Sequence, residues 1–146
     1  MLDVLSSTTS LPSGRKPHWV RHLAALATKA GEKCRLEAAG AAIALVMRVP
    51  APLKSIADQV IRSASSVPAN LAEGHGRTGR DRLYFWRIAY ASAKEVDSHL
   101  RLLAHAGVIN STKAEEALAT FDEVRAMTWR LLDPKPRARS TPDRCR

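Results

Sequence analysis

Four basic residues recur at intervals of seven along one stretch of the chain: Arg80, Arg87, Lys94 and Arg101. In a helix, this spacing places them along one slowly drifting line, with neighbours about 10 Å apart. Such a ladder could follow a phosphate backbone, which is the chemistry of electrostatic nucleic-acid binding. Asp97 lies within helical reach of Lys94 and Arg101, so a solvated face neutralised by local ion pairs is the alternative.

The distribution of the net charge of +9 bears on the same choice. Residues 1–35 carry six basic and two acidic side chains, residues 36–133 twelve and eleven, and residues 134–146 five and one. A nearly neutral body with two basic ends fits a scaffold that holds nucleic acid or an acidic protein, and a tail that only aids solubility is the alternative. We predict that four further basic residues join the ladder in binding nucleic acid: Arg77, Lys135, Arg137 and Arg139.

The segment 65–77 contains a proline inside an otherwise helical pattern. Pro68 has no amide proton for the carbonyl four residues earlier, so a kink is expected. We predict a structural role for Pro68, Asn70, Glu73 and Gly74. Catalysis by Glu73 with His75 would need a pocket, and no paired acid, phosphate loop or nucleophile–base spacing accompanies them. The sequence therefore predicts no catalytic residue.

Few other residues could bind a ligand. His18 and His22 have the spacing of helical metal ligands, but Trp19 occupies the glutamate position of an HExxH motif and no third ligand is near. Cys34 and Cys145 are too few for a disulfide framework or a four-ligand zinc site. We therefore predict no metal and no cofactor. Three tryptophans could stack on bases or anchor a core or interface: Trp19, Trp86 and Trp129.

The length and composition indicate one globular domain. The chain has 146 residues, of which 45% are hydrophobic and 25% charged, which excludes a disordered chain and a large multi-domain enzyme. The start lacks a signal-peptide pattern, and the longest apolar run, residues 38–47, is too short for a membrane span of about twenty residues. We expect a cytoplasmic protein with a polar leader at 1–16, a helical body at 17–133 and a basic tail at 134–146.

Periodic apolar residues predict two helices before residue 77. The first covers about 17–49, is weakened by Gly31 and ends before Pro50 and Pro52. Its apolar stripe is Val20, Ala24, Ala27, Cys34, Ala38, Ala41 and Leu45. The second runs to Gly74 and Gly76, with the stripe Leu53, Ile56, Val60, Ala64, Val67 and Leu71.

Capping-box patterns start two more helices, at Thr78 with Asp81 and at Thr112 with Glu115. The third helix, ending around 105–107, has the stripe Phe85, Trp86, Ala89, Ala93, Val96, Leu100 and Leu103. The fourth has the stripe Leu118, Phe121, Val124, Thr128 and Leu131 or Leu132. Short loops between four amphipathic helices favour an all-α, antiparallel up-down four-helix bundle. Leu83, Ile88 and Leu102 fall outside the third stripe and call for a second surface, as in an oligomer.

The segment 66–77 and the later run Ala91-Ser-Ala-Lys-Glu-Val, in a helix that contains Phe85, resemble a known family. It is the four-helix-bundle family of proteins encoded in intervening sequences of 23S ribosomal RNA genes, and the similarity covers about residues 38–133. The resemblance implies a homopentamer related to the accessory variability proteins of diversity-generating retroelements. Those relatives are basic partners of a reverse transcriptase that also contact nucleic acid.

These observations lead to two hypotheses. The first is a non-enzymatic, homo-oligomeric accessory protein that binds RNA or DNA electrostatically and docks on a partner enzyme such as a reverse transcriptase. The second is a structural or protein-interaction bundle that does not bind nucleic acid. No membrane partner is expected.

Overall fold

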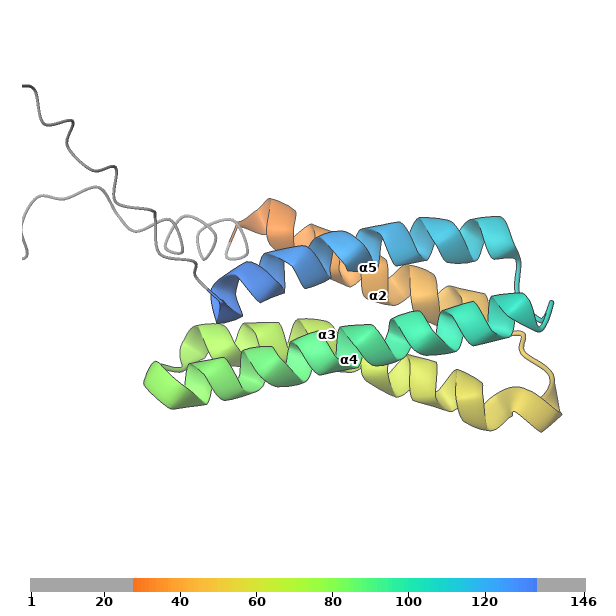
Figure 1. Ribbon diagram of the computed structural model, residues 1–146, viewed down its shortest axis with the longest axis horizontal. Helices are drawn as coiled ribbons and strands as arrows, with labels where there is room; N and C mark the ends of the chain where they lie inside the picture. Colours follow the sequence, from red (N-terminus) through yellow and green to blue (C-terminus); the bar gives the residue numbers. More distant parts are fainter. Residues whose placement is uncertain (1–27, 134–146) are drawn as a thin grey trace, which may run out of the picture.

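The computed structural model describes residues 28–133 and builds them from four α-helices and one short 3₁₀ turn (Figure 1). The helices are α2 (Lys29–Val46), α3 (Lys54–Gly76), α4 (Gly79–His105) and α5 (Ser111–Leu132), and the turn η1 (Ala51–Leu53) precedes α3. No helix in this part of the chain is both long and apolar enough to cross a membrane.

Several predicted features lie outside the described residues. They are the leader at 1–16, residues 17–27 of the first expected helix with His18, Trp19 and His22, and the tail at 134–146 with Lys135, Arg137, Arg139 and Cys145.

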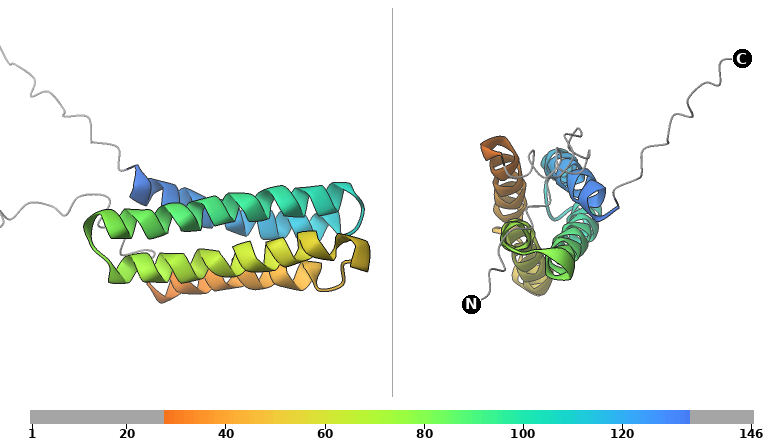
Figure 2. Two further views of the ribbon diagram at one scale, coloured as in Figure 1. Left: turned by 90° about the horizontal axis from the view of Figure 1, so that it is seen from below. Right: turned by 90° about the vertical axis from the view of Figure 1, so that its left-hand side faces the viewer.

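The four helices run alternately up and down and pack side by side, as Figure 1 and the end-on view of Figure 2 show. α3 and α4 share the largest interface, and α2 packs on both α3 and α5, which closes the bundle. The beginning of α2, the α3–α4 connection and the end of α5 lie at one end of the bundle. This arrangement confirms the predicted all-α four-helix architecture.

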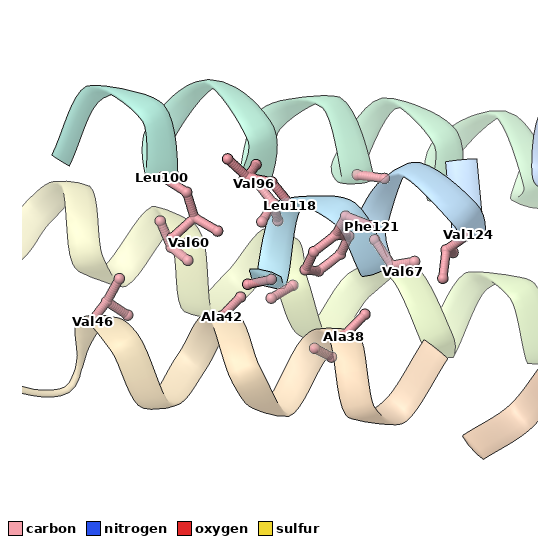
Figure 3. Packing of buried hydrophobic residues seen from close by; sticks show 14 of the residues in the cluster. Ala38, Ala42, Val46, Val60, Val67, Val96, Leu100, Leu118, Phe121 and Val124 are labelled. Carbon is pink, nitrogen blue, oxygen red and sulfur yellow. The ribbon is translucent and has the colours of Figure 1, made fainter. Parts of the chain in front are cut away.

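All four helices contribute to one interior, and Figure 3 shows their side chains turned toward it. The predicted stripes of α4 and α5 are buried apart from the half-buried Phe85 and Leu132, and that of α3 is buried from Val60 to Leu71. The stripe of α2 is wrong in part, because Ala41 is exposed and Ala42 is buried in its place. Residues 38–47 carry no charge on any side of the helix, so apolar periodicity cannot identify the inner face.

The helix starts agree with the sequence less well than the stripes do. Thr78 holds the N-cap position of α4, but its side chain makes no cap hydrogen bond. The start predicted at Thr112 is wrong, because α5 begins at Ser111 and the Asn110 side chain accepts a hydrogen bond from the Lys113 amide at 2.9 Å. Asn, Ser and Thr are all good N-cap residues, so three consecutive candidates leave the start ambiguous by one or two positions.

Candidate nucleic-acid interface

The predicted basic ladder lies on the outer face of α4. The opposite side of the helix is buried in the bundle and carries Trp86, Ala89, Ser92, Ala93, Val96, Leu100 and Leu103. Steps of four and three residues then pick out exposed positions along the whole outer side: Arg80, Tyr84, Arg87, Ala91, Lys94, Ser98 and Arg101. We call these seven residues the α4 outer line. Its four cations stand together on one surface, separated by small or aromatic side chains.

One of these four cations, Arg101, forms an ion pair with an acidic side chain. Arg101 donates from Nε to Asp97 at 3.0 Å and from Nη2 to the other carboxylate oxygen at 3.2 Å. Asp97 also contacts Nη1 of Arg125 from α5 at 3.6 Å, and its side chain is 18% exposed. The hydrogen bond and the charge of Asp97 raise the pKa of Arg101. Arg101 therefore lies in a local ion-pair network, as the alternative of a locally neutralised face predicts for this position.

The other three cations of the α4 outer line have no acidic partner in the part of the chain that the structure describes. Arg80, Arg87 and Lys94 are exposed and form no ion pair with any residue in the range 28–133. Exposed cations without an internal partner are the groups that can exchange counterions for phosphates. These three residues, which share the α4 outer line, are therefore candidates for phosphate contact.

Arg77 has a different environment from the ladder that it was predicted to join. It lies just beyond the end of α3, where its Nε donates to Glu73 at 2.8 Å and its guanidinium lies over the Phe85 ring at 5.6 Å. Its backbone carbonyl accepts from Nε of Arg82 at 2.7 Å, and the Arg82 guanidinium lies over the Trp86 ring. Arg77 therefore ties the α3–α4 corner together, and only part of its charge is open to a ligand.

The proline-centred segment packs α3 against α4. Pro68 lies inside α3, which continues through it to Gly76. Asn70 donates from Nδ2 to both the carbonyl and the hydroxyl of Ser66 at 2.8 Å, and that hydroxyl also accepts from Ser92 of α4 at 3.0 Å. Glu73 accepts a hydrogen bond from Arg77. All of these contacts lie within α3, at its end, or between α3 and α4.

Glu73 and His75 lie in different environments. Glu73 is exposed and engaged by Arg77. Nε2 of His75 is buried and has no hydrogen-bond partner among the described residues, and the same is true of Nε1 of the nearby Trp86. Burial, and then the charges of Arg35 and Arg82, lower the pKa of His75. The described residues contain no group of three His, Cys, Asp or Glu side chains placed to hold a metal.

α2 carries an apolar surface that the sequence patterns did not predict. Leu36 is 54% exposed and Met47 is 67% exposed, and the exposed Gly40 and half-buried Ile43 lie between them at helical spacing. The signal was present, because the uncharged run at 38–47 is apolar on all sides and one side of a bundle helix must face outward. We call Leu36, Gly40, Ile43 and Met47 the α2 outer face.

A groove of about 730 Å³ between α2 and α5 offers a third surface. Its charged residues are two acids and two bases, Glu37, Glu116, Arg48 and Lys113. This balance does not favour a polyanion, in contrast to the α4 outer line.

Comparison with known proteins places the chain in a family. No curated protein matches it. The family model described as 23S rRNA-intervening sequence protein matches residues 41–130, which is well over half of the chain. The match includes η1, α3 and α4, nearly all of α5, and therefore both the proline-centred segment and the α4 outer line. The chain belongs to the 23S rRNA-intervening sequence protein family.

Proposed function

We propose that this chain is a non-enzymatic, homo-oligomeric accessory protein that binds RNA or DNA through phosphate contacts and docks on a partner enzyme. The observation that carries the proposal is the α4 outer line, where Arg80, Arg87 and Lys94 are exposed together without an acidic partner in the described part of the chain. Basic flanks add four net positive charges on each side of the nearly neutral body. Binding of this kind depends on phosphates, so it is strongly salt-dependent and weakly selective for sequence.

The α2 outer face supports self-association. Burying exposed apolar side chains against a second surface lowers the free energy, so a helix face that gathers them favours association. A second copy of the chain is a partner always present at the right concentration, and closed symmetry is the usual form of such assemblies. The resemblance to pentameric relatives supports five subunits, as a homopentamer. A ring of subunits would repeat the α4 outer line on every subunit. Several weak electrostatic sites would then bind one nucleic acid with a higher overall avidity.

The proposal of a partner enzyme rests on the same family resemblance. Accessory proteins of diversity-generating retroelements work with a reverse transcriptase, and a basic assembly that holds nucleic acid suits that task. In a cytoplasmic setting, this chain would present an RNA or DNA strand to such an enzyme.

A protein-interaction bundle without nucleic acid is the second candidate. It is favoured by two half-exposed apolar side chains away from the α2 outer face, Leu102 of α4 and Trp129 of α5. Trp129 pairs with Tyr90 across the α4–α5 seam at 5.4 Å, so this aromatic surface is already ordered. Aromatic anchors of this kind are enriched at protein interfaces.

Filter-binding titrations of the full chain with a mixed-sequence RNA and a mixed-sequence DNA, over a series of salt concentrations, test the proposal. We expect both nucleic acids to bind. The logarithm of the binding constant should fall steeply and linearly with the logarithm of the salt concentration. Sedimentation equilibrium is expected to show an oligomer that persists at high salt, because apolar burial drives assembly. Absence of binding at low salt would leave the protein-interaction candidate, and a mass near 15.9 kDa at micromolar protein would contradict self-association.

A further inference from the structure

An aromatic ring stands between two of the unpaired cations of the α4 outer line. Tyr84 lies four positions after Arg80 and three before Arg87, and it is 60% exposed. With a helical rise of about 1.5 Å per residue, it is about 6 Å from the first and about 4.5 Å from the second along the axis. Arg80, Tyr84 and Arg87 therefore form one surface patch on the first turns of α4.

The fold makes little use of the Tyr84 side chain. Its ring meets the Phe85 ring at 5.5 Å between centroids and 77° between planes. A steep contact of this kind covers at most one face of the tyrosine ring. The hydroxyl has no hydrogen-bond partner within residues 28–133. Within the described part of the chain, one ring face and the hydroxyl are thus left open to a ligand.

The neighbouring Phe85 differs in all of these respects. It is half-buried, and the Arg77 guanidinium covers its ring at 5.6 Å. Arg77 is held in turn by Glu73. Phe85 thus anchors the corner between α3 and α4, and Tyr84 is supported by it without being enclosed.

We infer that Arg80, Tyr84 and Arg87 form a site for single-stranded nucleic acid, in which an unpaired base stacks on the Tyr84 ring and the arginines contact the flanking phosphates. An exposed aromatic ring in a basic track is the combination by which single strands are bound without sequence preference. The inference rests on the proposed function and specifies the form of nucleic acid that the α4 outer line binds.

The geometry favours a single strand over a duplex. In a duplex, each base already stacks on its neighbours and offers only its edges in the grooves. A ring on the outer face of a helix would then meet sugars and phosphates, which gain nothing from an aromatic face. Arg80, Arg87 and Lys94 can contact either form of nucleic acid, so the contribution of Tyr84 separates the two forms.

The test compares the full-length wild type with three variants at Tyr84. Tyr84→Ala removes the ring, Tyr84→Leu keeps an apolar side chain without an aromatic face, and Tyr84→Phe keeps the ring. Fluorescence anisotropy at one fixed salt concentration measures binding to a uridine oligonucleotide, a thymidine oligonucleotide and a DNA duplex of the same length. Sedimentation velocity measures the assembly of each variant.

We expect Tyr84→Ala and Tyr84→Leu to weaken single-strand binding by about fivefold or more, which is the usual value of one base–aromatic stack. Tyr84→Phe is expected to bind as the wild type does, and duplex binding and assembly are expected to be the same in all four proteins. An effect confined to the uridine or the thymidine probe assigns the site to RNA or to DNA.

Three outcomes would overturn the inference. Unchanged single-strand binding by Tyr84→Ala, with duplex binding intact, removes the stacking site and leaves the proposed function standing. Loss of assembly in Tyr84→Ala that Tyr84→Leu restores assigns the ring to a contact between copies of the chain. Wild-type protein that binds none of the three probes overturns the proposed function together with this inference.

Discussion

Gly74 of α3 lies directly against the indole ring of Trp86 of α4. A Cβ at position 74 would come within 2.5 Å of both Cδ1 and Nε1 of Trp86, and within 3.3 Å of the Arg82 carbonyl oxygen. Only a residue without a side chain allows the two helices to approach this closely near the α3–α4 connection. The contact explains why a glycine lies inside α3 despite the low helix propensity of this residue type.

Replacing Gly74 by alanine is therefore expected to destabilise the bundle. The new methyl group must displace a buried indole or separate two packed helices, and overpacking of this kind costs about 1–3 kcal/mol. Urea denaturation followed by far-UV circular dichroism measures the change. Gly76→Ala is the matched control, because a Cβ at Gly76 meets nothing within 4 Å. Equal stability of the two variants would contradict the close approach.

Replacing Pro68 by alanine is expected to stabilise the bundle while the helix content is retained. Alanine supplies the amide proton that proline lacks, and the hydrogen bond to the Ala64 carbonyl is worth about 1 kcal/mol. Thermal denaturation, with sedimentation equilibrium in parallel, measures the effect on the fold and on assembly. A lower melting temperature with a loss of oligomer would show that the proline shapes α3 for subunit packing. No change in either quantity would contradict a structural role.

Asp97 is expected to limit the affinity for nucleic acid. Asp97→Asn removes the charge that engages Arg101, so this cation becomes available to phosphates, whereas Arg125 keeps its contact with Asp122. We expect tighter binding and a salt dependence steeper by about 0.7–0.9 for each cation that gains a phosphate contact. Glu116→Gln is the control, because it removes one negative charge at the α2–α5 groove instead. Equal gains in both variants would show that net charge, and not the α4 outer line, governs binding.

His75 gives the stability a pH dependence of defined sign. Burial, followed by the charges of Arg35 and Arg82, lowers its pKa below the ordinary value of 6.5. The unfolded chain therefore takes up a proton near pH 6.5 that the folded chain accepts only at lower pH. The free energy of unfolding should fall as the pH drops below about 6.5, until the folded state is protonated as well.

Urea denaturation between about pH 7.5 and about pH 5 measures this loss. In His75→Asn the loss should be smaller, because the group responsible is gone. A loss as steep as that of the wild type would show that His75 is not its source.

The sequence predicts α3, α4 and α5 well because polar and apolar residues are separated on them. Val60, Phe121 and Leu100 lie in the core where their spacing places them. The buried face of α2 cannot be predicted in this way, because Ala41 and Ala42 are equally apolar and only tertiary packing decides which one is buried.

For the candidate site too, local helical spacing predicts one part, and contacts between helices decide the rest. Heptad spacing alone predicts that Arg80, Arg87, Lys94 and Arg101 share one surface. Whether the charge of Arg101 is neutralised depends on Asp97, which Arg125 of α5 also contacts, and that contact joins two helices. Tyr84 was within reach of the sequence, since its spacing from Arg80 and Arg87 matches one helix face.

The most direct test of the central claim is the salt dependence of binding when Arg80, Arg87, Lys94 and Arg101 are all changed to Gln. We expect RNA and DNA binding to weaken alike across sequences and the salt slope to flatten, while assembly survives because these side chains are exposed opposite the core. Deletion of residues 134–146 is expected to weaken binding further without unfolding the bundle. A quadruple variant that binds as tightly as the wild type at the same salt concentration would contradict the account.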